Sequence, residues 1–254
     1  MLLRARLSRL LPVPLRRRVR TLAAPWLYRL ERPRMARLYG QLVAPGDLVF
    51  VVGAAEGYHT AVLLALGARV VSVEPQPQLV RRLVARYAHQ ARVSVVGKGG
   101  AERAGSLELH MSYGDPELST FDVELMRQGR YADRRWEAQL EVPVVSLEDL
   151  IREHGQPSFI KIDVEGLEAR VLAGLQRPVA CLCFEYSREH HEQARQCVQR
   201  LLELGLARFN FSAYRRWSLV SDRWLEPEEL WARLDAIPDR WLGGDIFARS
   251  VTET

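Results

Sequence analysis

The sequence predicts an α/β protein built on a doubly wound, mostly parallel sheet of about seven strands, with a basic helical arm in front of it. Three observations indicate this fold. Short β-branched runs alternate with longer amphipathic segments along most of the chain. A loop of small residues, Gly53 to Gly57, follows the first of these runs, and Glu74 follows the second. With 254 residues, of which 48% are hydrophobic, the chain is long enough to bury the core of such a sheet.

The segment that ends at residue 96 predicts a βαβαβ unit. Pro45-Gly46-Asp47 is a turn before the first strand, and Gly67 ends the first helix. A strand, a helix and a second strand of these lengths form a parallel crossover, so a ligand belongs at the carboxyl ends of the strands. The expected elements are strand 48–52, helix 57–66, strand 69–73, helix 76–89 and strand 92–96.

The rest of the chain continues the alternation and ends in a hairpin-like pair of strands. The polar segment 112–138 separates two alternating runs and is too long for a tight turn, so we expect a lid over the ligand site or a partly ordered loop. Ser146 is predicted to cap a helix that has Asp149 in its first turn. The expected elements are strands 106–111, 139–145, 159–163, 179–185, 207–212 and 246–249, and helices 146–153, 165–173, 189–204 and 227–234.

Charge divides the chain into an arm, 1–44, and one domain, 45–254. Residues 1–40 contain eleven Arg and one acid, a net charge of +10, which leaves −5 for the rest of a chain whose total is +5. We expect the arm to pack partly on the domain and otherwise to be solvated; contact with an anionic membrane face and an organellar transit peptide are the alternatives. Nucleic acid is disfavoured because no base-reading motif accompanies the basic residues.

Cysteine content and hydropathy predict a cytoplasmic protein. No apolar run reaches the length of about 18 residues that a membrane span needs, and there is no signal peptide. Cys181, Cys183 and Cys197 stand in apolar surroundings, which indicates buried thiols rather than disulfides or metal ligands. No ligand spacing demands a metal, so we predict no metal site; a divalent cation on the carboxylates Asp163 and Glu165 is the alternative. Peripheral contact at the inner membrane face and a homo-oligomer remain open alternatives.

The loop Gly53-Ala54-Ala55-Glu56-Gly57 predicts a site for an adenosine-containing cofactor. Small residues let a ligand approach the backbone, and the following helix directs its free N–H groups outward. Glu74 lies 21 residues beyond Gly53, at the end of the next strand, where a carboxylate can accept both hydroxyls of a ribose.

A short-chain dehydrogenase is the rival interpretation of this loop. That family needs a Tyr-xxx-Lys pair, and the chain has only two lysines, Lys98 and Lys161. Ser94 and Pro157 stand four positions before them, so no such pair exists. The G-x-G-x-x-G order that supports a pyrophosphate is also absent.

The charged segment FIKIDVEGLE, residues 159–168, carries the strongest functional signal. Residues two apart share a face of a strand, so Lys161, Asp163 and, if the strand continues, Glu165 should line up toward its carboxyl end. Three charges on a buried strand are costly unless they face a site or form an internal ion pair, and both interpretations stay open. Arg occurs 34 times and Lys twice, which indicates that a compact ammonium is needed at Lys161.

Four segments, VVGAAEGYHT, VVSVEPQP, VSLEDL and FIKIDVEGLEARVLAGL, together resemble the FkbM family of S-adenosylmethionine-dependent methyltransferases. The resemblance covers roughly residues 45–250 and includes the ending DIFAR. It implies the class I methyltransferase fold, with S-adenosylmethionine as cofactor and O-methylation of a sugar, glycolipid, polysaccharide or other natural product. By the same resemblance, Gly53, Ala54 and Gly57 adjoin the methionine portion and Glu74-Pro75 the ribose. The family's signature block falls on Lys161, Asp163, Glu165, Gly166 and Glu168.

The opening loop departs from the family pattern D-x-G-A-N-x-G-Y. Val51 replaces the acid, Ala55 replaces the Asn, and Glu56 replaces an apolar residue. Either Glu56 supplies the missing carboxylate from another angle, or affinity for the cofactor is weakened. The departures also leave open a degenerate methyltransferase fold that serves as a non-catalytic binding or scaffold protein.

For catalysis we expect Asp163 or Glu165 to be the base or to orient the acceptor hydroxyl, with Lys161 tuning their charge. Glu185, His190 and His191 are second choices for the base. We expect segment 112–138 to select the acceptor, through aromatic residues that either stack on a sugar ring or anchor the lid: Tyr113, Phe121, Tyr131 and Trp136. A further set of tryptophans is expected to pack rather than to bind ligand: Trp217, Trp224, Trp231 and Trp241.

Overall fold

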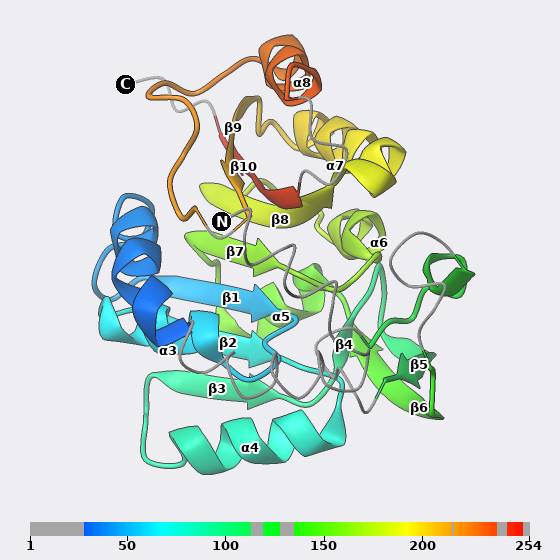
Figure 1. Cartoon of the computed structure of the whole chain (residues 1–254). Helices are drawn as coiled ribbons and strands as arrows, with labels where there is room; N and C mark the ends of the chain where they lie inside the picture. Colours follow the sequence, from blue (N-terminus) through cyan, green and yellow to red (C-terminus); the bar gives the residue numbers. More distant parts are fainter. Residues whose placement is uncertain (1–27, 113–118, 128–134, 215, 238–242, 251–254) are drawn as a thin grey trace, which may run out of the picture.

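A computed structural model shows the fold of the chain (Figure 1) and describes residues 28–112, 119–127, 135–214, 216–237 and 243–250. Most of the Arg-rich arm lies outside these residues, so the alternative of membrane contact stays open and the cytoplasmic location stays a prediction. Within the described residues, no helix combines the length and the apolar character that a membrane crossing requires.

Seven strands form the central sheet in the order β3-β2-β1-β7-β8-β10-β9. The first five of these pair in parallel, whereas β10 runs antiparallel to both of its neighbours. This confirms the predicted sheet and its late antiparallel pair. The strands are β1 (Leu48–Val52), β2 (Arg69–Val73), β3 (Val93–Val96), β7 (Phe159–Ile162), β8 (Cys181–Ser187), β9 (Arg208–Ala213) and β10 (Gly243–Arg249).

The sheet is buried on both faces, as a doubly wound fold requires. Along β1, Val49 and Val51 belong to one apolar cluster, and Phe50 and Val52 belong to the other. The first cluster is covered by helix 28–39, α3 (Tyr58–Ala65) and α4 (Pro77–Tyr87). The second is covered by α5 (Leu147–His154), α6 (Glu168–Ala173), α7 (His191–Glu203) and α8 (Pro227–Asp235). All three cysteines are buried free thiols, as predicted.

Helix 28–39, the described end of the arm, is packed against the sheet. Its residues Met35, Leu38 and Tyr39 are at most 1% exposed and belong to the same cluster as Val49 and Val51. Burial of these three side chains ties the helix firmly to the domain. The described end of the arm thus packs on the domain, as expected, and the division of the chain between residues 44 and 45 stays a prediction.

A second, three-stranded sheet lies beyond the carboxyl ends of the first three strands (Figure 1). Its order is β4-β6-β5, formed by Gly99–Gly100, Ala138–Val145 and Gly105–Met111. The two predicted strands 106–111 and 139–145 are thus confirmed, and they pair with each other rather than with the central sheet. The segment between them includes a short 3₁₀ helix, η2 (Leu125–Arg127).

The start of helix α5 agrees with the sequence, whereas the start of helix α6 does not. Ser146 caps α5 through a capping box with Asp149, as the sequence indicates. The helix expected from residue 165 begins instead at Glu168. Glu165 and Gly166 have φ angles of 50° and 105°, a left-handed conformation that no helix contains, so the chain turns there before α6 starts. The strand in front of this turn ends at Ile162, so Glu165 does not lie on it.

Candidate functional site

The loop after β1 is held by close contact between backbones. Gly53 has a φ angle of 88°, and a Cβ atom there would lie 1.7 Å from the carbonyl oxygen of Asp163. The N–H groups of Gly53 and Ala54 donate to the carbonyl of Val73, at 2.9 and 3.0 Å. Gly57 serves packing instead, because a Cβ atom there would lie 2.6 Å from a methyl carbon of Leu83 on α4.

Glu74 stands at the end of β2 and is only 3% exposed. One carboxylate oxygen accepts the N–H of Ala55 at 2.8 Å, and the other accepts the N–H of Gln76 at 2.9 Å. Each oxygen keeps a second lone pair, so the carboxylate can still accept two hydroxyls. Burial raises the pKa of Glu74 to about 7, against the two backbone hydrogen bonds.

Two pockets open at the carboxyl ends of the strands. The first, which we call the Glu74 pocket, includes Gly53, Ala55, Glu74, Pro75, Gly99 and Phe121 in its wall. The second, which we call the Trp217 pocket, has a volume of about 130 Å³ and includes Tyr28, Ala54, His59, Lys161, Trp217 and Asp245. Gly53, Ala55, Asp163 and Glu165 line both pockets, so these residues form a shared wall.

Lys161 is buried at this wall and is 1% exposed. Its Nζ atom lies 2.6 Å from a carboxylate oxygen of Asp245 and 3.1 Å from one of Asp163. Burial disfavours the charged ammonium, but the two carboxylates outweigh burial and raise the pKa of Lys161 well above its usual value. The charges of segment 159–168 were expected either to face a site or to form an internal ion pair. Both hold, because Lys161 forms ion pairs and also lines the Trp217 pocket. Sequence reasoning missed Asp245, which stands in the quoted ending DIFAR.

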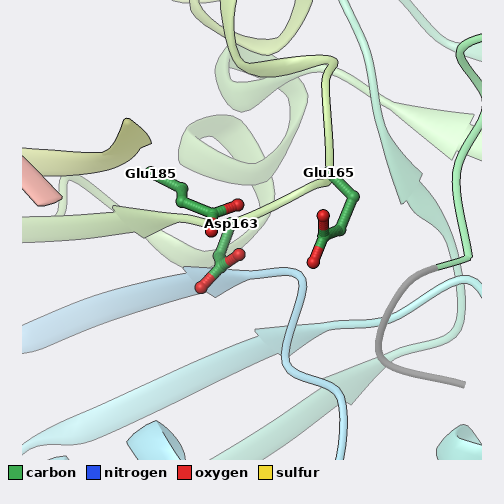
Figure 2. Close-up of side chains that lie close together, drawn as sticks. All are labelled: Asp163, Glu165 and Glu185. Atoms are coloured by element: carbon green, nitrogen blue, oxygen red, sulfur yellow. The ribbon is translucent and has the colours of Figure 1, made fainter. Parts of the chain in front are cut away.

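Asp163, Glu165 and Glu185 bring three carboxylates together (Figure 2). One oxygen from each lies within 4.8 Å of the other two, and all three side chains are partly exposed. Oxygen ligands of this kind suit a divalent cation. Exposed acids commonly cluster without an ion, so the cluster alone does not assign a metal.

Glu168 shapes the turn that carries Glu165. Its carboxylate accepts the N–H groups of Val164 and Gly166, both at 3.1 Å, and the side chain is 4% exposed. Burial raises the pKa of Glu168 to about 7. The last acid of the signature block is thus a positioning residue, which acts by holding the Asp163–Glu168 turn in its left-handed shape.

Aromatic side chains line the Trp217 pocket. Tyr28 of helix 28–39 stacks on Tyr58 of α3, with ring centroids 3.7 Å apart and planes 9° from parallel. The indole N–H of Trp217 donates to Glu31 at 3.2 Å, across 186 residues of sequence. Trp217 packs against the buried cluster, as expected, and also forms part of a pocket wall.

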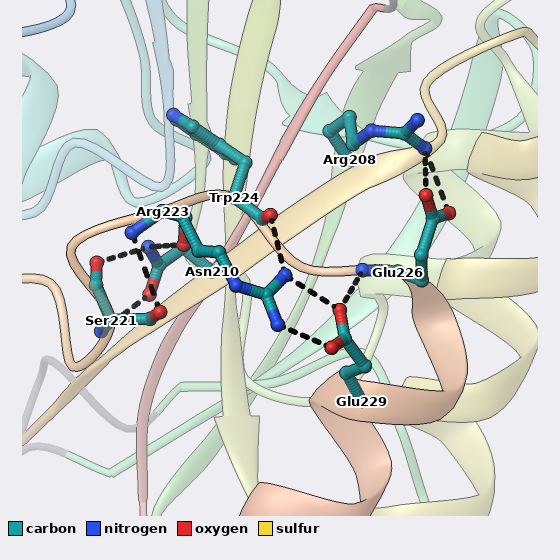
Figure 3. Close-up of polar contacts among 7 residues, drawn as sticks. All are labelled: Arg208, Asn210, Ser221, Arg223, Trp224, Glu226 and Glu229. Atoms are coloured by element: carbon teal, nitrogen blue, oxygen red, sulfur yellow. Dashed lines mark hydrogen bonds and ion pairs between the residues drawn. The ribbon is translucent and has the colours of Figure 1, made fainter.

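The connection that carries Trp217 is fixed to β9 by a buried amide. Asn210 is 1% exposed and donates to the carbonyl oxygens of Ser221 and Arg223, at 2.8 and 3.2 Å (Figure 3). Its own oxygen accepts the N–H of Ser221 at 3.2 Å. Two ion pairs, Arg208 with Glu226 and Arg223 with Glu229, close the far end of this connection. Trp217 is thus presented by an ordered segment.

His59, in the first turn of α3, also faces the Trp217 pocket. Its Nδ1 atom lies 2.7 Å from the hydroxyl of Tyr39, and the Trp217 ring meets it edge-on at 5.7 Å. Burial, followed by the charge of Lys161, lowers the pKa of His59 to about 4, so the ring is neutral at pH 7. Sequence reasoning missed this residue, although it directly follows the loop within the quoted VVGAAEGYHT.

The profile of the FkbM methyltransferase domain matches residues 52–215, more than half of the chain. The chain belongs to the FkbM methyltransferase family. This confirms the resemblance, sets aside the dehydrogenase alternative and supports S-adenosylmethionine as the methyl donor. Among curated proteins, none matches the chain significantly.

Solved structures similar to this FkbM-family protein include other methyltransferases. A precorrin-6y C5,15-methyltransferase from Geobacter metallireducens shares 10% identity over 85% of this chain and 87% of that chain, with a TM-score of 0.43. Fibrillarin from Aeropyrum pernix with bound S-adenosylmethionine shares 14% over 82% and 68%, with a TM-score of 0.44. A magnesium protoporphyrin IX methyltransferase from Synechocystis shares 11% over 88% and 79%, also at 0.44.

The Glu74 pocket of this FkbM-family protein fits an adenosyl methyl donor in two respects. Glu74 keeps lone pairs for two hydroxyls. Ser119, which lines the same pocket, has a buried hydroxyl oxygen that makes no hydrogen bond within the described chain. The predicted residues Gly53, Glu74, Pro75, Asp163 and Glu165 are thus brought together here, whereas Ala54 lies on the Trp217 side.

Glu56 lies elsewhere in this FkbM-family protein. Its carboxylate pairs with Arg82 of α4 at 2.5 Å, and neither pocket includes it. This geometry argues against Glu56 as a substitute for the missing acid. Val51 is fully buried and is paired in register with Lys161, so an acid at position 51 would stand beside that ammonium. Lys161 already has two carboxylate partners without it.

Several other predicted residues lie outside the Trp217 pocket. Of the second-choice bases only Glu185 lines it; the Nδ1 atom of His190 lies 2.9 Å from the Ser187 hydroxyl, and His191 packs on Trp231. Trp224 packs beneath Arg249, as expected of a structural tryptophan. Tyr113, Tyr131 and Trp241 lie outside the described residues.

The described part of segment 112–138 adjoins the Glu74 pocket. Its residues Ser119 and Phe121 line that pocket, and Trp136 packs on Leu125. Within the ranges that the structure describes, none of its residues lines the Trp217 pocket. Thr120 joins this part to β5 and to Glu165. Residues 113–118 and 128–134 lie outside the described residues, so the role of the whole segment in selecting the acceptor stays a prediction.

Proposed function

We propose that this methyltransferase moves a methyl group from S-adenosylmethionine to a hydroxyl oxygen of a sugar, glycolipid, polysaccharide or other natural product. The observation that carries the proposal is the shared wall: Gly53, Ala55, Asp163 and Glu165 line both pockets. A donor in the Glu74 pocket and an acceptor in the Trp217 pocket would meet at these residues.

Bound S-adenosylmethionine supplies a methyl group on a sulfonium sulfur, which an oxygen can displace in line. The residues of the chain hold the acceptor oxygen close and aligned, and take its proton. Asp163 and Glu165 stand where that oxygen would approach, so we assign them to orient the hydroxyl or to accept its proton. Lys161 fixes Asp163 through the 3.1 Å contact.

His59 adds a hydrogen-bond acceptor on the acceptor side. Its pKa of about 4 keeps the ring neutral, and Tyr39 holds Nδ1 at 2.7 Å. Burial raises the pKa of Tyr39 well above its usual value, so that hydroxyl keeps its own proton. If Nδ1 donates to Tyr39, then Nε2 has a free lone pair for an acceptor hydroxyl.

The lining of the Trp217 pocket supports a hydroxylated ring as acceptor. The faces of Tyr28, Tyr58 and Trp217 offer apolar surface on which a sugar ring or a similar ring can stack. Glu185 and Asp163 offer acceptors for ring hydroxyls. This combination of aromatic faces and carboxylates suits neutral polyhydroxyl compounds better than phosphorylated ones, which the carboxylates would repel.

The direct test follows a tritium-labelled methyl group from S-adenosylmethionine into a panel of methyl glycosides that includes neutral, amino and phosphorylated sugars. We expect label on an oxygen of a neutral sugar. Asp163→Asn should lower turnover about a hundredfold, since a positioned base contributes that much, while binding of S-adenosylhomocysteine is retained. Turnover of Asp163→Asn equal to wild type would contradict the role of Asp163, and label only on nitrogen would contradict O-methylation.

Calorimetry with S-adenosylhomocysteine separates this enzyme from the scaffold alternative. Wild-type protein should bind the ligand with one site per chain. If millimolar ligand produces no binding heat and no rise in melting temperature, the enzyme proposal fails and a non-catalytic role is favoured.

A further inference from the structure

The described part of the long polar insertion is held in place from two sides. Thr120 exchanges backbone hydrogen bonds with His110 of β5, at 2.9 and 3.1 Å. Its hydroxyl donates to the carbonyl oxygen of Glu165 at 2.6 Å. Thr120 therefore joins the small sheet to the Asp163–Glu168 turn.

The residues after Thr120 reinforce this attachment. The N–H of Asp122 donates to the Thr120 hydroxyl at 3.0 Å, and the Asp122 carboxylate accepts the N–H of Leu125 at 3.1 Å. Leu125 is 3% exposed and lies over Gly166, where a Cβ atom would approach it to 3.0 Å. Residues 119–125 are thus anchored at a defined position against the signature block.

Ser119 and Phe121 flank Thr120, and both line the Glu74 pocket. Residues two apart in an extended segment point to the same side, which explains why these two side chains enter the pocket together. A Cβ atom on Gly99 would lie 2.6 Å from the tip of the Phe121 ring, so the ring rests on the Gly99 backbone. The Ser119 hydroxyl oxygen is buried and has no hydrogen-bond partner in the described chain.

The position of Glu74 orders the rest of the pocket. The methyl end of a donor must lie at the wall shared with the Trp217 pocket, which includes Gly53 and Glu165. Glu74 takes the ribose next to that wall. The adenine ring of the donor then lies where Gly99 and Phe121 face the pocket.

We propose that Ser119 and Phe121 recognise the adenine ring of the methyl donor, Phe121 by contact with the ring and Ser119 by a hydrogen bond to its edge. The inference deepens the proposed function and rests on its donor pocket. Adenine carries both donors and acceptors at its edge, and a hydroxyl can serve either. Two residues of a segment that was expected to select the acceptor would thereby contact the donor.

The test titrates S-adenosylhomocysteine and, separately, adenosine into wild type, Ser119→Ala and Phe121→Ala. Loss of one hydrogen bond should raise both dissociation constants about fivefold in Ser119→Ala. Loss of ring contact should raise both about tenfold or more in Phe121→Ala, since stacking of a base on an aromatic ring is of that strength. Equal factors for the two ligands are expected, because the lost contact is to the part they share.

Ser106→Ala is the matched control, because Ser106 lies on β5 of the same small sheet, bonds to Glu141 and lines neither pocket. Phe121→Leu replaces Phe121→Ala if circular dichroism shows that the alanine variant does not fold. The proposal is overturned if wild type binds S-adenosylhomocysteine and both variants bind within about twofold of it. Failure of wild type to bind would overturn the proposed function as well, so the two failures are distinguishable.

Discussion

The Glu74 pocket and the Trp217 pocket share a wall but are built in different ways. The Glu74 pocket is formed largely by backbone turns that follow β1, β2 and β7, with glycine at the closest approaches. The Trp217 pocket is formed by side chains from helix 28–39, α3, β10 and the connection after β9. The Glu74 pocket thus depends mainly on turns that follow the strands, with Ser119 and Phe121 added from the insertion, whereas the Trp217 pocket depends on how distant elements pack.

Lys161 lines the Trp217 pocket and pairs with Asp163 of the shared wall, and its removal should have the largest effect. Lys161→Met leaves Asp163 and Asp245 close together without a counterion at a largely buried position. Breaking such a group costs about 3 kcal/mol of unfolding free energy. Urea unfolding followed by circular dichroism measures this loss.

The double variant Lys161→Met/Asp245→Asn provides the control. It removes one of the two uncompensated carboxylates and should recover part of the lost stability. An unchanged urea midpoint in Lys161→Met would contradict the prediction, because it would show that Asp163 and Asp245 do not need the ammonium of Lys161 as a counterion.

Glu74→Gln tests the Glu74 pocket alone. Its pKa of about 7 means that the carboxyl is partly protonated at neutral pH. Ribose hydroxyls donate to the ionised form, so affinity for S-adenosylhomocysteine should rise with pH through about 7 and weaken below it. Glu74→Gln should weaken binding roughly tenfold at high pH, because a hydrogen bond to a charged group is worth about 1.5–3 kcal/mol, and should flatten the pH dependence. Calorimetry across this range measures both effects.

Glu168→Gln is the matched control for that experiment. Burial raises the pKa of Glu168 to about 7 as well, but the side chain holds a turn and does not line the Glu74 pocket. The pH dependence of donor affinity should persist in this variant. If it disappears here and survives in Glu74→Gln, the titrating group has been assigned wrongly.

Trp217→Leu tests the Trp217 pocket alone. Loss of the indole ring should raise the KM for the best glycoside of the panel about fivefold, because a ring contact of this kind contributes about 1 kcal/mol. The dissociation constant of S-adenosylhomocysteine should stay unchanged. Trp224→Leu controls for loss of a tryptophan outside the pocket and should leave the glycoside KM at its wild-type value. Parallel changes in both ligands would mean that the pockets are not separable.

Glu56→Ala should have the smallest effect. Glu56 pairs with Arg82 on the surface and lines neither pocket. An exposed ion pair of this kind contributes about 0–1 kcal/mol to stability, and its loss should leave the affinity for S-adenosylhomocysteine unchanged. Calorimetry beside Glu74→Gln measures the contrast. A clear loss of affinity in Glu56→Ala would revive the idea that this residue replaces the acid missing at Val51.

The donor half of the site was largely predictable from sequence. The alternation of a strand, a glycine loop and an acid after the next strand can each be recognised within a short stretch of sequence. Parallel crossover connections then place the carboxyl ends of the strands at the same edge of the sheet. The same logic placed Lys161 and Asp163 near the loop. Glu165 also lies near the loop, but on a left-handed turn at residues 165 and 166, which the strand-to-helix pattern did not predict.

The sequence by itself determined the sheet, the donor loop with Glu74 and the charged block after β7, since each is encoded by local pattern. Only the tertiary structure decided that Asp245 neutralises Lys161, that Tyr39 holds His59, and that Trp217 faces a pocket. These contacts join segments between 20 and 186 residues apart. No periodicity or spacing reports such pairings, because they arise from the order in which strands and helices pack.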